Sequence, residues 1–257
     1  MAQADEQELR RRQRESQRAF YRAMADGSEG AKLLTLDGID ATIVPAREWF
    51  SIFNSVFYRE PADLERAHSA LTEKYEAAAV KAWTVWVPPG DRRAASILEG
   101  RGHVLDSTPM LFAAPIDALD VEPRIHLDLD PDPSWETVCR VNDQAHGVLE
   151  PWSMAAVFQK MDDPASQLHV ARRDKAPVAA LIAREQDGDC YFWFVATVPD
   201  AQGAGLASEL MRHALRDARD RGCTTSSLES TKVAERMYEQ LRYRPLGRYE
   251  MWERRST

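Results

Sequence analysis

A loop with two glycines lies between an apolar segment and an amphipathic segment, and this part of the sequence is best suited to bind an anion. The apolar run 190–198 leads into Pro199, then Gly203 and Gly205, and then the helical pattern 204–221. The first N–H groups of a helix have no intrahelical partner and lie at the positive end of its dipole. Glycines let such a backbone approach a ligand closely. The loop is therefore expected to hold a phosphate or pyrophosphate, unless the glycines serve only a tight turn.

Two anion-binding patterns fit this loop. Gly203-x-Gly205-x-x-Ser208 differs by one residue from the dinucleotide fingerprint. That fingerprint belongs to the first βαβ unit of a parallel sheet, whereas three strands too closely spaced to be parallel precede this loop. The second pattern, Gln202-x-x-Gly205-x-Ala207, resembles the R/Q-x-x-G-x-G/A motif of the GNAT superfamily of N-acetyltransferases, which also follows a central strand and opens a helix.

A second stretch extends the resemblance. GNAT proteins continue with a strand and a short helix that reads N-x-x-A-x-x-[LFM]-Y-x-x-x-G-[FY]. Segment 231–243 departs from this pattern at Thr231, in place of Asn, and at Arg242, in place of Gly. The residues that match it are Ala234, Met237, Tyr238 and Tyr243. Since the order of elements over 134–253 also agrees, the chain is identified as a member of the GNAT superfamily.

The resemblance implies acetyl-CoA as the acyl donor, bound where the central strand separates from its parallel neighbour. The implied backbone contacts are Val195, Ala196 and Thr197 for the pantetheine arm, and Gln202, Gly203, Ala204, Gly205, Leu206, Ala207 and Ser208 for the pyrophosphate. It also implies that Tyr238 is the general acid that returns a proton to the thiolate. The alternative is that Tyr238 belongs to the apolar stripe of its helix and is a core residue.

The sequence leaves the general base unassigned, because the run 190–198 contains no carboxylate. Glu229, at the end of the next strand, is the nearest candidate, and in the dinucleotide interpretation it would bind a ribose. Glu150 and His146 follow, in a turn that borders the acceptor site in the family. Each could instead be a solvated or capping residue. Trp152, Phe192 and Trp193 could line an acceptor pocket, although such residues are more often core.

These residues must be positioned by two similar halves. Residues 134–253 are expected to form α-α-β-β-β-α-β-α-β, ending in the strand 245–253. The N-terminal segments repeat part of this order as strand 49–58, helix 61–78, strand 81–87, helix 92–100 and strand 103–113. Where the glycine loop would lie, this half has Arg59-Glu-Pro-Ala-Asp63. We predict an α/β fold of two GNAT-like lobes, the first degenerate. Each is a mixed, largely antiparallel sheet flanked by helices, with one parallel β-α-β crossover.

The Pro- and Asp-rich stretch 115–134 gives the best boundary. The predicted division is an N-terminal lobe of residues 1–116, a linker of residues 117–133 and a catalytic lobe of residues 134–257. The first lobe begins with a charged helix over 5–26. Acidic residues are interspersed among its arginines, which favours a solvated helix face over an RNA-binding arm.

The composition of the chain excludes several classes of protein and of partner. The chain has 257 residues, 44% of them hydrophobic, three cysteines and a net charge of −8. There is no apolar run near the ~18 residues of a membrane span, and the acidic charge disfavours nucleic acid and anionic membranes as partners. The cysteines fit neither a disulfide scaffold nor a zinc pattern, and His213 is expected on a surface or in packing, so no metal site is expected. The N-terminus lacks the apolar core of a signal peptide, so a cytoplasmic protein is expected.

The expected activity is direct transfer of an acetyl group from acetyl-CoA to a primary amine of a small molecule, since no cysteine lies near the site to carry the acyl group. A protein N-terminus or lysine remains open as the acceptor, as does a homodimer. The alternative activity is a CoA-binding or regulatory module that no longer catalyses.

Overall fold

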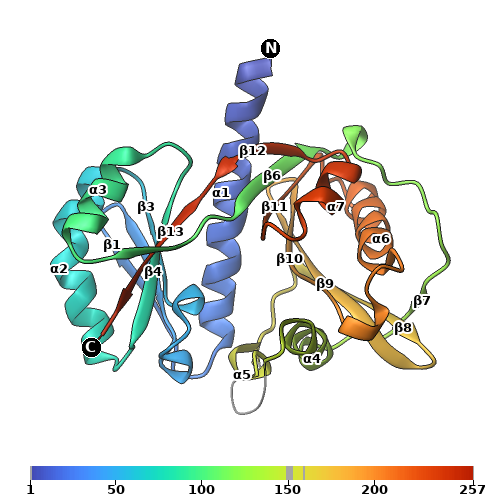
Figure 1. Ribbon diagram of the computed structural model, residues 1–257, viewed down its shortest axis with the longest axis horizontal. Helices are drawn as coiled ribbons and strands as arrows, with labels where there is room; N and C mark the ends of the chain where they lie inside the picture. The colour runs from blue at the N-terminus through green and yellow to red at the C-terminus, as the bar shows by residue number, and fades with distance from the viewer. Residues whose placement is uncertain (1, 149–152, 159, 257) are drawn as a thin grey trace.

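Two mixed β-sheets lie side by side, and the long helix α1 (Ala2–Gly27) contacts both of them (Figure 1). This computed structural model describes residues 2–148, 153–158 and 160–256. Each sheet has one parallel pair of strands joined by a helix, β3 with β4 and β10 with β11, while its other pairs are antiparallel. The predicted class, a mixed α/β fold with two lobes of this kind, is confirmed.

The N-terminal sheet has six strands in the order β1-β2-β3-β4-β13-β5. Its strands are β1 (Lys32–Leu36), β2 (Ile39–Ile43), β3 (Ser55–Tyr58), β4 (Ala82–Val87), β5 (Val104–Ser107) and β13 (Glu250–Arg255). Helix α2 (Pro61–Ala77) connects the parallel strands β3 and β4, and α3 (Arg92–Gly100) follows β4. The predicted strand 49–58 starts only at Ser55, because Ser51–Phe53 forms a 3-10 turn.

The C-terminal sheet has seven strands in the order β12-β6-β11-β10-β9-β8-β7. Its strands are β6 (Met110–Pro115), β7 (Asp128–Leu129), β8 (Ser166–Arg173), β9 (Ala176–Gln186), β10 (Asp189–Thr197), β11 (Thr225–Ser230) and β12 (Arg244–Arg248). The helices are α4 (Trp135–His146), α5 (Ala155–Phe158), α6 (Leu206–Asp220) and α7 (Glu235–Gln240). Alternate residues of β9 point to opposite faces of the sheet. Ala180 and Ile182 pack in one core with residues of α1 and α4. Ala179 and Leu181 pack in a second core with residues of α6. The helices therefore cover both faces of this sheet.

The two sheets exchange strands, which the sequence did not reveal. The predicted strand 103–113 is in fact two strands, β5 in the N-terminal sheet and β6 between β11 and β12 of the C-terminal sheet. The predicted strand 245–253 is also two strands, β12 beside β6 and β13 between β4 and β5. The division into residues 1–116, 117–133 and 134–257 stays a prediction, and β6 and β13 cross it.

The predicted linker is tied to α6. The backbone N–H of Arg124 donates to Glu209 at 3.0 Å, and the guanidinium of Arg212 donates to Asp120 at 3.1 Å. Because Glu209 and Arg212 are buried in α6, these contacts anchor the segment on the C-terminal lobe. Strand β7, within the same segment, adds the edge strand beside β8.

Helix α1 has a solvated face and a buried face. As predicted for a solvated face, its arginines pair with acids of the same helix, Arg10 with Glu6 at 2.6 Å and Arg11 with Glu15 at 2.6 Å. The buried face carries the apolar residues Leu9, Phe20, Tyr21 and Met24 but also the polar residues Gln13, Ser16 and Gln17. The helix is therefore a core element between the two sheets.

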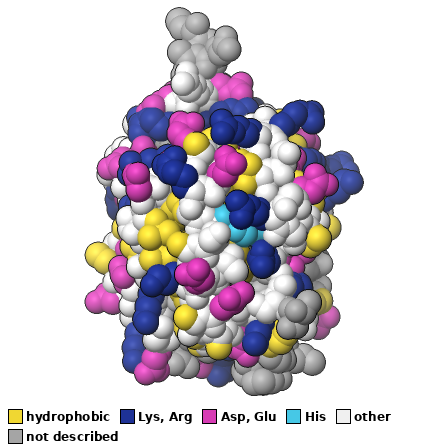
Figure 2. All heavy atoms as spheres, turned by 90° about the vertical axis from the view of Figure 1, so that its left-hand side faces the viewer, with side chains coloured by type: hydrophobic (Ala, Val, Ile, Leu, Met, Phe, Trp, Pro, Cys, Tyr) yellow, Lys and Arg dark blue, Asp and Glu magenta, His cyan; other side chains and the backbone are white. Residues whose placement is uncertain are grey.

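The outer side of the N-terminal lobe, which carries α2 and α3, is seen in Figure 2. Lysines and arginines lie among aspartates and glutamates on this face, so the view shows both signs of charge interspersed. Within the described ranges, no helix is both long enough and apolar enough to span a membrane.

Removing the ring of Phe20 should weaken the packing of α1 against the sheets and so destabilise the protein. Phe20 is fully buried, with its ring centroid 4.4 Å from that of Trp193 and 6.1 Å from that of Tyr191. Because the cavity left by a buried aromatic ring refills only partly, Phe20→Ala should lower the free energy of unfolding by about 3–5 kcal/mol. Urea titration measures this. Ile125→Ala, at an exposed position, is the control and should leave the midpoint unchanged; equal effects of the two substitutions would contradict the assignment.

Candidate functional site

Strands β10 and β11 separate after a short paired stretch. They pair in parallel only from Asp189↔Thr225 to Tyr191↔Ser227. Beyond that point β10 continues beside β9 alone, with a bulge between Trp193 and Ala196. Phe194, inside the bulge, has a φ of 49°, a backbone conformation that a non-glycine residue rarely adopts. The edge of β10 that faces β11 is therefore open over its C-terminal half.

A cavity of about 320 Å³ lies at this separation. Its described lining comes from both lobes and from four elements of the C-terminal lobe. The lining residues are Ile52, Phe53, Asn142, His146, Met154, Phe192, Trp193, Phe194, Val195, Glu229, Ser230, Thr231, Ala234 and Tyr238. Most are apolar, so the few polar groups in the cavity are well placed to orient a ligand.

Glu229 is the carboxylate of this lining, two residues beyond the last β10–β11 pair. The hydroxyl of Tyr191 donates to its Oε2 at 2.5 Å, and the side-chain amide of Gln13 donates to its Oε1. Burial raises the pKa of Glu229 to about 7, although both donors act to lower it. A carboxyl group with this pKa is divided between its two protonation states at neutral pH, which suits proton transfer.

Hydrogen bonds join helix α1 to β10 and β11 near the stretch where these two strands pair. Gln13 is fully buried and also accepts a hydrogen bond from the hydroxyl of Tyr249 at 2.9 Å. One turn further on, Ser16 donates to the buried Asp189 at 2.9 Å. Asp189 also accepts from Thr225 at 2.8 Å and from Ser227 at 2.6 Å, so its buried carboxyl group is fully hydrogen-bonded. The strand pair and α1 are thus held together by polar contacts below the cavity.

Tyr238, on α7, lines the cavity and is 4% exposed. Burial raises the pKa of its hydroxyl above the ordinary value, so the phenol is protonated at neutral pH. Within the described part of the chain its hydroxyl has no hydrogen-bond partner, while the ring packs on Phe112 with centroids 5.7 Å apart. Tyr238 is therefore both a core residue and a wall of the cavity. Val233, just before α7, is 96% exposed and does not pack with Tyr238 in the core.

The glycine loop runs from β10 to α6, as predicted. Gly203 and Gly205 have φ values of 77° and 75°, and Gly205 is the N-cap of α6 with no side-chain hydrogen bond to cap the helix. Among the described residues, neither a carbonyl nor a side chain accepts a hydrogen bond from the backbone N–H groups of residues 203–208. The amide of Gln202 folds back onto the carbonyl of Thr197 at 3.2 Å. The loop therefore presents a set of free N–H donors at a helix N-terminus.

The structure brings several predicted site residues to one cavity. Glu229, Trp193, Val195 and His146 line it together with Tyr238. Trp193 also belongs to an aromatic cluster with Phe20, Phe53, Phe158 and Phe194. The candidates Glu150 and Trp152 lie outside the described residues. The functional roles of all these residues stay predictions.

Sequence reasoning missed Gln13, Ile52, Phe53 and Asn142. Gln13 lies on the stripe of α1 that also contains Leu9 and Phe20, and a polar residue on an apolar stripe was the available signal. Ile52 and Phe53 offered none, because they lie far from the cavity's other residues in the sequence.

Comparison with known proteins gives a family match for part of the chain and a shared fold for most of it. Residues 134–243 match the model of the acetyltransferase (GNAT) family. The fold is similar to a GCN5-related N-acetyltransferase from Kribbella flavida, with a TM-score of 0.67 and 18% identity over 93% of this chain and 96% of that one. It is also similar to a GCN5-related N-acetyltransferase from Sphaerobacter thermophilus, with a TM-score of 0.61 and 17% identity over 88% of this chain and 82% of that one.

A third similar structure is a tandem GNAT protein from the clavulanic acid biosynthesis pathway, with a TM-score of 0.57 and 11% identity over 89% of this chain and 84% of that one. At such identities the likeness concerns the fold alone. Among curated proteins, none matches this sequence.

Removing a hydrogen bond that Glu229 accepts should raise the pKa of this carboxyl group. Gln13→Leu removes a donor that stabilises the carboxylate, so the pKa of Glu229 should rise above about 7. A ¹³C NMR titration of the carboxyl groups measures this, with Glu229→Gln identifying the resonance. Gln7→Leu, on the exposed side of α1, is the matched control. A pKa of Glu229 that stays constant or falls in Gln13→Leu would show that Gln13 does not act on this carboxyl group.

Proposed function

We propose, from the match of residues 134–243 to the acetyltransferase (GNAT) family model, that the protein transfers an acetyl group from acetyl-CoA to the primary amine of a small molecule. The observation that carries the proposal is the combination of an open β10 edge with the free N–H groups of residues 203–208. An extended amide-containing arm fits the first, and a pyrophosphate fits the second.

The proposed donor site uses main-chain groups. Val195 and Ala196 lie on the open edge and would pair with the amides of the pantetheine arm as an added strand would. Thr197 would contribute less, because its carbonyl already accepts from Gln202. The N–H groups from Gly203 to Ser208 would hold the pyrophosphate at the positive end of α6.

Glu229 and Tyr238 are the proposed proton-transfer groups. Glu229 takes a proton from the amine nitrogen as it forms a bond to the acetyl carbon. Tyr238 then gives its proton to the sulfur as the carbon–sulfur bond breaks. The raised pKa of each supports its role, because Glu229 is ionised in part at neutral pH while Tyr238 keeps its proton. Both line the same cavity, as the reaction requires.

The cavity supports a small amine as the acceptor. Its volume of about 320 Å³ is at the lower end of the range for small-molecule sites, and Ile52 and Phe53 of the N-terminal lobe form part of its wall. The carboxylate of Glu229 would attract a cationic amine. None of the three cysteines is among the described lining residues, and all three are buried, which supports direct transfer. Free buried cysteines also fit the cytoplasm, where we place the protein.

Bulk at Gly205 should block the donor site. Gly205→Val should raise the Kd for CoA by about 100-fold or more, because the side chain and the distorted loop remove several hydrogen bonds to the pyrophosphate. Isothermal titration calorimetry measures this. Gly90→Val is the matched control, since Gly90 also has a positive φ and open space around it but lies in the N-terminal lobe. If the two variants bind CoA equally well, the glycine loop is not the pyrophosphate site.

Removing either proton-transfer group should slow the reaction, and the pH dependence of kcat/KM should distinguish the two variants. Both Glu229→Gln and Tyr238→Phe should lower kcat by about 10²–10⁴-fold. In the unmodified protein kcat/KM should fall as the pH drops below about 7, because Glu229 must be ionised to accept a proton. Only Glu229→Gln should abolish this dependence. Tyr75→Phe, which removes a buried hydroxyl in the N-terminal lobe, is the control.

The measurement is thiol release from acetyl-CoA across a panel of amino acids, aminoglycosides, polyamines and peptides. Release that depends on a small amine supports the proposal, and release only with peptides would assign a protein acceptor instead. CoA binding without release by any amine would identify a regulatory CoA-binding module.

A further inference from the structure

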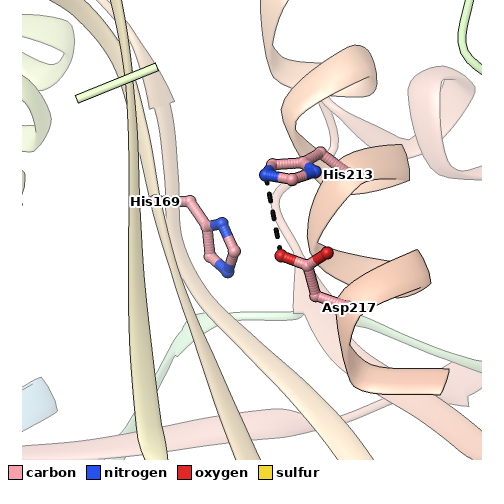
Figure 3. A group of neighbouring side chains, drawn as sticks. All are labelled: His169, His213 and Asp217. Carbon is pink, nitrogen blue, oxygen red and sulfur yellow. Dashed lines mark ion pairs between the residues drawn. The ribbon is translucent and has the colours of Figure 1, made fainter. Parts of the chain in front are cut away.

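A second group of reactive side chains lies between β8 and α6, away from the cavity. His169 is on β8, and His213 and Asp217 are one turn apart on α6. Figure 3 shows the ring of His169 directed toward the helix, where His213 and Asp217 project toward it. One ligand atom of each residue lies within 4.8 Å of the others. Nε2 of His213 is 3.6 Å from Oδ2 of Asp217, and the two imidazole rings are 5.6 Å apart at 87°.

His169 has a ring nitrogen without a partner. Its Nε2 is buried, and no described residue forms a hydrogen bond with it. A buried polar atom left unpaired costs free energy, so native structures rarely keep one without a ligand, an ion or a water molecule. An imidazole nitrogen without a hydrogen-bond partner can offer its lone pair to a metal ion.

We propose that His169, His213 and Asp217 form a site for a divalent transition metal ion of the zinc class. Two imidazoles and one carboxylate suit zinc better than calcium or magnesium, which prefer oxygen ligands. Metal–ligand distances of about 2.0–2.2 Å place tetrahedral ligand atoms about 3.4 Å apart, which small side-chain rotations would achieve from the present separation. The fourth position would be open to water.

The surroundings support a cation at this position. The side chains of His213 and Asp217 are 29% and 35% exposed, so an ion can reach the site from solvent. The positive charge of Arg221 acts on His169. Because Arg221 is paired with Glu185 at 2.5 Å, this charge is offset by a carboxylate. A bound ion would link β8 to α6, the helix that begins at the glycine loop. None of the three residues belongs to the described lining of the cavity, so this site is independent of the proposed reaction.

The test uses the full chain, stripped of metal with a chelator and then titrated with zinc chloride by calorimetry. We expect one equivalent to bind. At a free zinc concentration about 100 times Kd, Tm should rise by roughly 5–10 °C. Cobalt(II) chloride should give the intense visible absorption of a tetrahedral site with nitrogen and oxygen ligands. His213→Gln and Asp217→Asn, at partly exposed positions where folding should persist, should each weaken zinc binding by at least about tenfold.

His126→Gln, at an exposed histidine, is the matched control and should bind as the unmodified protein does. The buried pair His68 and His103, whose Nε2 atoms are 3.0 Å apart, is the competing site. Loss of zinc binding in His68→Gln with retention in His213→Gln would overturn the proposal, as would the absence of stoichiometric binding. Acetyl transfer is not part of the readout, so the outcome does not depend on the proposed function.

Discussion

The separation of β10 from β11 after their short paired stretch determines where the cavity and the glycine loop lie. A strand that loses its neighbour exposes backbone N–H and C=O groups that need other partners. Here the bulge at Phe194 turns β10 away, and a cavity replaces the missing strand contacts. The same separation places the end of β10 directly before the glycine loop. One local break in pairing thus creates both the open strand edge and the route to the free N–H groups of α6.

Polar side chains of α1 stabilise the point where β10 and β11 separate. Below it, Asp189 gathers hydroxyl donors from Ser16 of α1 and from β11. Above it, Glu229 takes donors from Gln13 and Tyr191. Burying a carboxyl group is costly unless it is hydrogen-bonded, so these contacts are needed wherever the two strands part. Because Gln13 is also bonded to Tyr249, the chain segment that leads into the N-terminal sheet is coupled to the same carboxyl group.

The features that the sequence predicted are those with contiguous determinants. The glycine loop was recognisable because an apolar strand, Gly205 and a helical pattern follow one another directly, and Tyr238 because its spacing lies within one short helix. The exchange of β6 and β13 was not, since the pattern of 245–253 is the same for one strand as for two strands in different sheets. Gln13 and Phe53 reach the site only through tertiary packing, which periodicity does not reveal. His213 was expected on a surface or in packing, because its neighbour His169 lies on a strand that is distant in the sequence.

The two lobes share a topology, yet the described residues leave more free N–H donors at the crossover helix of the C-terminal lobe than at that of the N-terminal lobe. In the C-terminal lobe, Gly205 is the N-cap of α6, and no side chain among the described residues satisfies the first N–H groups of this helix. In the N-terminal lobe, α2 begins with Pro61, which has no N–H, and Asp63 accepts a hydrogen bond from the backbone of Glu60 at 3.1 Å. Two carboxylates thus stand where an anion would bind, and they would repel it. Beyond the last β3–β4 pair, the rings of Phe57 and Trp86 stack with centroids 6.3 Å apart. The N-terminal lobe therefore satisfies its helix terminus with its own residues and packs aromatic rings at its strand separation, which suits a supporting wall. In the C-terminal lobe the equivalent N–H groups have no partner among the described residues.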